Sequence, residues 1–176
     1  MFAPSVAIVN AVLTLHADAP LPLAQIARSA GVSYAVAQSA VATLEKRGLV
    51  TREMRSGRDE FAPDRQSPYY PMAYGAALVD LPIDKALKGH RIQAVYAYGS
   101  LASPGGGSRQ SDLDLLIVGD VRDREELVVR LSEVGQRLGR AIDPLILTPE
   151  EVDAGLARND SHVAAALRGI RLRGSV

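Results

Sequence analysis

The sequence of 176 residues has no cysteine and no tryptophan, and aromatic residues make up only 5% of it. The absence of cysteine excludes a disulfide framework, a thiolate zinc site and a cysteine nucleophile. The three histidines, His16, His90 and His162, are isolated from one another and form no His-rich metal motif. No apolar run approaches the roughly 20 residues that span a bilayer, and the first residues lack the basic segment of a signal peptide. We therefore expect a soluble, cytoplasmic protein without a membrane partner.

An excess of charge of one sign is also missing, because 20 Lys and Arg balance 20 Asp and Glu. A net charge of zero argues against bulk binding of polyanions and is compatible only with a local basic patch. The length allows one or two small domains, each large enough to bury a core. Any function must therefore be sought in local motifs.

Prolines interrupt the periodic pattern at Pro63, Pro68 and Pro71, within residues 59–72. Proline disfavours helix at its own position and at the residue before it, so we expect an extended connector in this segment. The sequence predicts two modules: residues 1–65, then a linker and connecting helix at 66–89, then residues 90–176.

The first module has a helical pattern followed by a hairpin pattern. Apolar residues recur at helical spacing from Ser5, the expected N-cap of a first helix. A second helix is expected to end at Gly31, and a third to begin after Ser33. Residues 49–61 then favour a strand, a tight turn and a second strand. This order, with a Gly-Val-Ser turn between the second and third helices, resembles the winged helix-turn-helix of bacterial transcription regulators.

That resemblance implies that the third helix lies in the major groove of double-stranded DNA and that the basic hairpin contacts its phosphates. It also implies a homodimer whose two copies bind paired half-sites. Gln38 is suited to an adenine edge, and Tyr34 to a phosphate or a thymine methyl group. The reading face carries no Arg or Lys, so we expect modest base discrimination or a module that serves mainly in dimerisation. The alternative for the hairpin is an ordinary solvated surface. The candidate DNA-binding residues are Ser33, Tyr34, Gln38, Ser39, Arg52, Arg55 and Arg58.

The second module pairs a Gly-Ser step with two spaced acids. A strand pattern over residues 92–98 ends at Gly99-Ser100, and a second strand pattern enters through Asp112 and Asp114. Residues two apart in a strand share a face, about 6 to 7 Å from each other. Two carboxylates held this close repel each other unless a cation lies between them, and Mg²⁺ suits oxygen ligands. A Gly-Ser step offers backbone N–H groups and a hydroxyl to a phosphate.

Gly99-Ser100 followed by Ser111-Asp112-Leu113-Asp114-Leu115-Leu116 resembles the signature of the minimal nucleotidyltransferases, in the DNA polymerase beta-like superfamily. The resemblance implies an α+β fold, with a small mixed sheet flanked by helices. It also implies a third carboxylate from a later strand, and Asp143, in a strand pattern after a helical one at 124–140, is the candidate.

By the same resemblance, Asp112, Asp114 and Asp143 are the catalytic and metal-binding residues, and Asp143 is the candidate base for the incoming hydroxyl. Gly99, Ser100 and Ser111 are expected on the triphosphate. Ser103 and Pro104 stand where the family has Arg-Gly, and Arg109 is the candidate substitute for that arginine.

Together the two resemblances predict a DNA-binding regulator-type protein that transfers a nucleoside monophosphate from a triphosphate, with ATP expected, to a protein hydroxyl. The cofactor would be Mg²⁺ or Mn²⁺, and the acceptor a separate protein such as a toxin. Two alternatives stay open. One is a transcription regulator whose degenerate second module only senses nucleotide or dimerises. The other is an antitoxin-type protein that acts by binding a partner.

Overall fold

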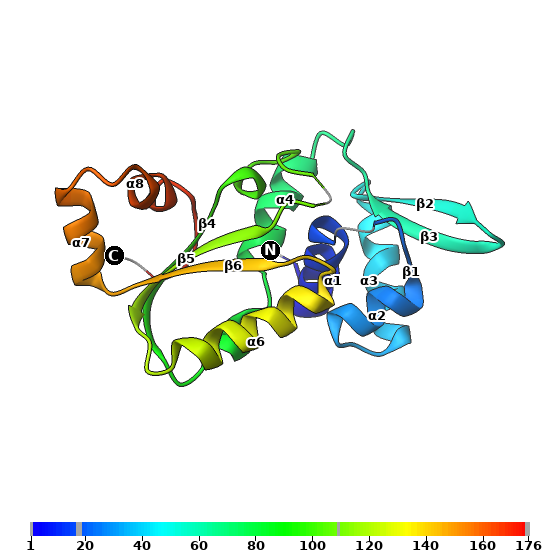
Figure 1. Cartoon of the computed structure of the whole chain (residues 1–176). Helices are drawn as coiled ribbons and strands as arrows, with labels where there is room; N and C mark the ends of the chain where they lie inside the picture. The colour runs from blue at the N-terminus through cyan, green and yellow to red at the C-terminus, as the bar shows by residue number, and fades with distance from the viewer. Residues whose placement is uncertain (1, 17–18, 109, 175–176) are drawn as a thin grey trace. The chain divides into compact units, whose positions relative to one another are not determined.

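The computed structural model describes residues 2–16, 19–108 and 110–174. The chain divides into two compact units at Leu81 and Pro82, apart from the segment Arg137–Gly139, which groups with the first unit. The elements of both are labelled in Figure 1. Within the described residues, no helix is both long and apolar enough to cross a membrane.

The first unit contains a helical core and a small antiparallel sheet with the strand order β1-β3-β2. Its first three helices pack on one another through side chains such as Val9, Leu13, Ile26 and Leu44, which are fully buried. Its elements are α1 (Pro4–Leu15), β1 (Leu21–Pro22), α2 (Leu23–Ala30), α3 (Tyr34–Lys46), β2 (Val50–Arg55), β3 (Arg58–Pro63) and α4 (Tyr70–Val79).

Local sequence signals account for most of these boundaries. Gly31 ends α2 in the left-handed conformation, with φ 66°, and the side chain of Ser33 caps α3 by accepting from the backbone N–H of Val36, as predicted. The expected N-cap at Ser5 is wrong: α1 begins at Pro4, after Ala3. Proline is favoured in the first turn, where its missing N–H has no intrahelical acceptor to lose.

The proline-rich segment is not the extended connector that the sequence predicts. Its first part belongs to strand β3, and its last part begins helix α4, which has Pro71 in its first turn. Helix α4 packs on α1, with Tyr74 and Leu78 buried, and the side-chain amide of Asn10 donates to the carbonyl of Ala73 at 2.9 Å. The core of the first unit therefore extends beyond residue 65.

The second unit is built on a four-stranded mixed sheet with the order β6-β5-β4-β7. Strands β5 and β6 are parallel and are connected by α6, whereas β4 is antiparallel to both β5 and β7. Its elements are α5 (Asp84–Leu87), β4 (Arg91–Tyr98), a 3-10 turn (Ser100–Ala102), β5 (Leu113–Asp120), α6 (Arg124–Arg137), β6 (Ile142–Leu147), α7 (Pro149–Ala157), α8 (Ser161–Leu167) and β7 (Ile170–Gly174).

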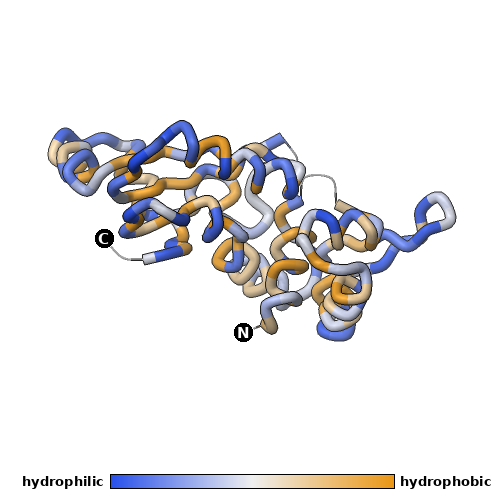
Figure 2. The backbone as a smooth tube through the Cα atoms, turned by 90° about the horizontal axis from the view of Figure 1, so that it is seen from below, coloured by the Kyte–Doolittle hydropathy of each residue, from blue (hydrophilic) through white to orange (hydrophobic). Residues whose placement is uncertain are grey.

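Helices α7 and α8 cover one face of this sheet. Tyr96, Leu116 and Val118 of the sheet form an apolar core with Val152 of α7 and Val163 of α8. In Figure 2 strands β4 and β5 are mostly hydrophobic, whereas the β2–β3 hairpin of the first unit is mostly hydrophilic. Both units together make a mixed α+β protein, as the sequence predicts.

Candidate functional site

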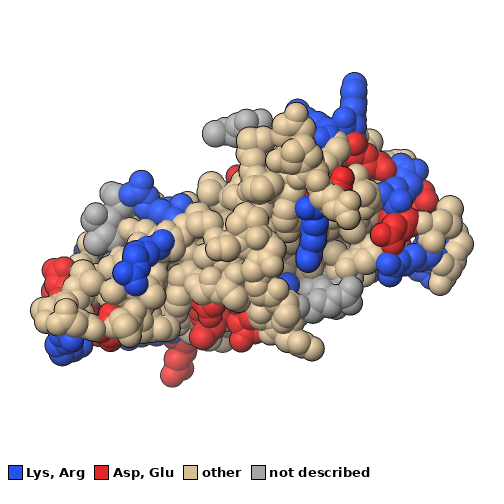
Figure 3. Space-filling model, turned by 90° about the horizontal axis from the view of Figure 1, so that it is seen from above, with Lys and Arg blue, Asp and Glu red and all other residues tan. Residues whose placement is uncertain are grey.

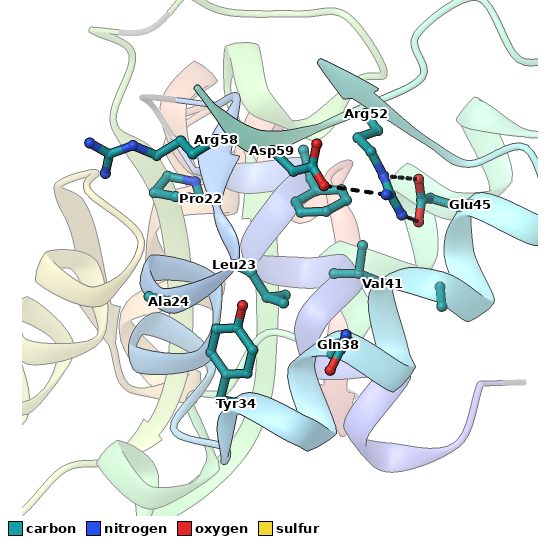
Figure 4. Close-up of a pocket in the computed structure, with 12 residues that line it drawn as sticks. Pro22, Leu23, Ala24, Tyr34, Gln38, Val41, Glu45, Arg52, Arg58 and Asp59 are labelled. Atoms are coloured by element: carbon teal, nitrogen blue, oxygen red, sulfur yellow. Dashed lines mark hydrogen bonds and ion pairs between the residues drawn. The ribbon is translucent and has the colours of Figure 1, made fainter. Parts of the chain in front are cut away.

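The exposed face of α3 lies beside the β2–β3 hairpin. Tyr34 is 56% exposed, and it lines a depression of about 450 Å³ together with Gln38 from the same helix and Arg52 and Arg58 from the hairpin. Figure 4 shows these side chains around the depression. Four of the predicted DNA-binding residues are thus brought to one place.

Arg52 ties the hairpin to α3 instead of extending freely from it. Its Nε and Nη2 atoms donate to Glu45 of α3 at 3.1 and 3.0 Å, and Nη1 donates to Asp59 of β3 at 3.3 Å. The guanidinium also lies 5.4 Å from the ring centre of Phe61. The hydrogen bond and the charge of Glu45 are the main causes that raise the pKa of Arg52. A phosphate that contacts Arg52 must compete with these two carboxylates.

The other two arginines of the hairpin differ from each other. Arg55 pairs with Glu53 at 2.8 Å, whereas Arg58 has no ion pair among the described residues. Figure 3 shows basic and acidic side chains interleaved over the first unit. The wing is therefore close to neutral, and Arg58 is its one arginine available to a phosphate within the described residues. Ser39 is exposed on α3, but it does not line the depression.

In the second unit, the strand register brings two of the predicted acids together. Asp114 of β5 lies directly opposite Asp143 of the parallel strand β6, and Asp112 lies two residues earlier in the chain. The pKa of Asp114 is raised by burial and then by the charges of Asp143 and Asp112, whereas His162 opposes the shift. The carboxylates of Asp112 and Asp143 are thus both close enough to Asp114 to act on its charge.

Gly99 makes room for the carboxylate of Asp114. Its φ of 71° is in the left-handed region, and a Cβ atom at this position would overlap Oδ2 of Asp114. A Cβ atom on Gly107 would lie 3.1 Å from Oγ of Ser100 and 3.0 Å from Oγ of Ser111. The hydroxyls of these two serines therefore both lie beside Gly107, close to each other. The predicted phosphate-binding residues Gly99, Ser100 and Ser111 therefore border one short loop.

An arginine that sequence reasoning missed holds this loop. Nη1 of Arg140 donates to the carbonyl of Ser108 at 3.1 Å and also to the carbonyl of Ser111, while Ser111 Oγ accepts from the backbone N–H of Ser108 at 2.8 Å. Arg109, the predicted substitute for the family's arginine, lies outside the described residues. Arg140 comes just before the strand that carries Asp143, and this adjacency is the signal that could have identified it.

Tyr98 and His162 also border the acids, and neither was a predicted site residue. The Tyr98 hydroxyl lies 3.2 Å from Nε2 of His162, and their rings meet edge to face at 5.5 Å. Burial, followed by the charges of Asp114 and Asp143, raises the pKa of Tyr98. Tyr98 could have been found from its place one residue before Gly99, but nothing local marks His162.

A metal ion would have to find its ligands among these acids. In the part of the chain that the structure describes, no group of three or more His, Cys, Asp or Glu side chains is assembled so that it could hold a metal. Magnesium, however, is commonly bound by one or two carboxylates together with waters and substrate phosphates. The facing pair Asp114 and Asp143 fits that mode, although it does not fit an all-protein cage.

Residues 10–60 match the model of the MarR family. The match begins within α1 and ends within β3, so it covers the second half of α1, all of α2 and α3, and most of the hairpin. It supports the prediction of a winged-helix regulator module in this part of the chain. It does not reach the second unit, whose polymerase beta-like identity stays a prediction. No curated protein and no solved structure matches the chain.

Proposed function

We propose that this protein is a transcription regulator that binds double-stranded DNA through its winged helix. The match of residues 10–60 to the MarR family carries this proposal. The exposed, uncharged start of α3 would lie in the major groove, and the β2–β3 hairpin would follow the adjacent backbone. Arg58, which has no ion pair among the described residues, would contact a phosphate or the minor groove.

A binding experiment tests this function. The full chain is titrated against a mixture of random duplexes at low salt, and fluorescence anisotropy reports binding. We expect affinity that falls as salt rises, because phosphate contacts release counterions, and that weakens in Arg58→Ala. Arg122→Ala, which removes an exposed arginine of the second unit, is the matched control. No retention of DNA by the wild type at low salt would contradict the proposal.

We further propose that the protein acts as a homodimer, as proteins of the MarR family typically do. Exposed apolar side chains on and beside α4, namely Tyr69, Met72 and Val79, line a groove of about 630 Å³ that also includes Arg47 and Asp80. A two-fold axis through this groove would bring the same apolar side chains of the two copies together. A second copy of the chain is thus the proposed occupant.

The facing pair Asp114 and Asp143 favours a second function, nucleotidyl transfer by the second unit. Asp114 and Asp143, together with waters and the phosphates, would hold Mg²⁺ or Mn²⁺, which would neutralise charge on a bound triphosphate such as ATP. Gly99, Ser100 and Ser111 would bind its phosphates. Asp143 would accept the proton of a hydroxyl on a separate protein, whose oxygen would form a bond to the α-phosphorus while the bond from this phosphorus to the departing pyrophosphate breaks.

Transfer of label from a nucleoside triphosphate distinguishes this function from its alternatives. The full chain is incubated with labelled ATP, Mg²⁺ and an extract of its host, and Asp114→Asn is compared with Asp153→Asn, an exposed acid of α7. Label on a protein that is lost only in Asp114→Asn supports transfer. If the protein binds nucleotide but transfers no label, the second unit is a sensing module. If it neither binds nucleotide nor transfers label, the result favours a protein that acts by binding a partner, as an antitoxin does.

A further inference from the structure

The exposed face of α3 offers one amide and several small or apolar groups to a DNA groove. Its side chains before Glu45 are uncharged, and the hydroxyl of Thr43 is bonded to the carbonyl of Ser39 at 2.9 Å. The capping oxygen of Ser33 is likewise engaged by the backbone N–H of Val36 at 3.3 Å. Gln38 is therefore the residue of this face best suited to a two-point contact with a base.

The chemistry of Gln38 favours adenine. A glutamine amide donates and accepts at the same time, which matches the N7 and N6 atoms of adenine, whereas guanine is most often read by the paired donors of Arg or Lys. The described face of α3 has no such cation before Lys46. A guanine at this position would therefore meet no strong specific partner.

The apolar groups next to Gln38 favour thymine. Ala35 and Ala42 are exposed on the same helix, three residues before and four residues after Gln38, and small apolar side chains contact the C5-methyl group that thymine alone presents in the major groove. Ala42 lines the same depression as Gln38. A G·C pair presents no methyl group there, so each of these side chains would lose its contact at a G·C pair, and binding to that pair would be weaker.

The wing adds a second, independent preference. Arg52 pairs with Glu45 and Asp59, and Arg55 pairs with Glu53. Arg58 is the wing arginine without an ion pair in the described chain, and it directly follows the turn between β2 and β3. A single arginine inserted into a minor groove is attracted most strongly where the groove is narrow, as in A-tracts.

We propose that the winged helix reads A·T-rich half-sites, with Gln38 on an adenine, the small side chains of α3 on thymine methyl groups and Arg58 in a narrow minor groove. This inference rests on the proposed DNA-binding function and names the sequence class that it recognises. Discrimination comes from an amide and methyl contacts, and the near-neutral wing keeps non-specific binding weak.

The test is a selection from a random duplex library by the full chain at low salt, followed by titration of the selected site. We expect A·T-rich half-sites in which one A·T to G·C change costs on the order of tenfold in affinity. Gln38→Ala removes that discrimination at one position, and Gln38→Arg moves the preference there toward guanine. Gln136→Arg, which adds the same charge on α6, leaves the selected sequence unchanged.

The outcomes separate this inference from the function on which it rests. Selected sites rich in G·C, or binding without any sequence preference, would overturn the A·T reading while leaving DNA binding in place. Absence of any retained duplex at low salt would overturn both. An A·T-rich site that Gln38→Arg leaves unchanged would contradict the role of Gln38.

Discussion

Glu45 on α3 and Arg52 on β2 form a two-point ion pair, with N–O distances of 3.0 and 3.1 Å, that ties the wing to the reading helix. Figure 4 shows Asp59 completing the group from the neighbouring strand. The same arginine that would contact DNA phosphates is thus partly neutralised in the free protein, and this relationship sets the expected strength of DNA binding.

Glu45→Gln should therefore strengthen DNA binding. Removing the carboxylate leaves Arg52 paired only with Asp59, through one contact that a phosphate can replace, so the salt dependence should steepen by up to ~0.9 in the slope of log affinity against log salt. Anisotropy titrations at several salt concentrations measure this slope. Glu125→Gln on α6 removes one charge elsewhere and should leave the slope unchanged; an equal gain in both variants would show a general charge effect.

Met72→Glu should weaken the proposed dimer. Met72 is 70% exposed on α4 within the apolar groove, and Met54 is 71% exposed at the hairpin, so Met54→Glu is a closely matched control. A charge introduced into an apolar interface costs affinity because it must be desolvated or left unpaired. Sedimentation equilibrium should show the dimer in the wild type and in Met54→Glu, and a larger monomer fraction in Met72→Glu. A wild type that is monomeric at every concentration rules out this interface.

Asp114→Asn should stabilise the protein at neutral pH. The pKa of Asp114 is raised in the folded state, so the folded protein binds more protons than the unfolded chain between the ordinary and the raised value. The contribution of this acid to the free energy of unfolding is therefore fully present below the ordinary pKa and is lost as pH rises through the raised one. Asparagine has nearly the size of aspartate but no charge, so the variant does not lose this free energy of unfolding as pH rises.

Thermal unfolding of the wild type and Asp114→Asn at several pH values tests this sign. The melting temperature of the variant should exceed that of the wild type near pH 7, and the difference should shrink as pH falls below the ordinary aspartate pKa. Asp153→Asn, which removes one exposed acid of α7, is the control for the loss of a charge. A variant less stable than the wild type at pH 7 would mean that the Asp114 carboxylate is stabilised by contacts that outweigh its repulsion.

Gly99→Ala should destabilise the second unit more than Gly105→Ala. Both glycines have positive φ, 71° and 76°, so both substitutions carry backbone strain of about 1 kcal/mol or more, and the ψ of −159° at Gly99 is a conformation that only glycine adopts readily. Only at Gly99 would the new methyl group overlap Asp114, whereas open space surrounds Gly105. Urea unfolding should place the midpoint of Gly99→Ala clearly below that of Gly105→Ala, and equal midpoints would contradict the close approach.

The sequence predicts the first unit well where local signals decide the structure. Gly31 ends α2 in the left-handed conformation and Ser33 caps the start of α3, and these signals depend only on nearby residues. Pro71 misled the prediction, because proline ends a helix in its interior but is tolerated in its first turn. Helix α4 is held by packing on α1, which no local pattern reveals.

Long-range contacts explain what was missed at the candidate sites. Arg52 on β2 pairs with Glu45 on α3 and with Asp59 on β3. Because a local sequence pattern does not reveal contacts between separate elements, the sequence indicates a basic wing, whereas the structure has a near-neutral one. His162 contacts Tyr98 from a helix that no motif marked, and Arg140, just before β6, donates to the loop that precedes the neighbouring strand β5. By contrast, Asp143 was identified because the resemblance implies an acid on the strand that follows the helix, and the strand register places it opposite Asp114.

Titration of one duplex with a reading-face variant tests the central proposal, DNA binding by α3, most directly. Ala42 and Ala165 are both exposed alanines in helices, on α3 and α8, so Ala42→Glu and Ala165→Glu add the same charge in matched settings. At low salt, the wild type and Ala165→Glu should bind the selected duplex equally, and Ala42→Glu should bind on the order of tenfold more weakly or worse, because a carboxylate would face the DNA. Equal binding by all three proteins, or none by the wild type, would contradict the proposal.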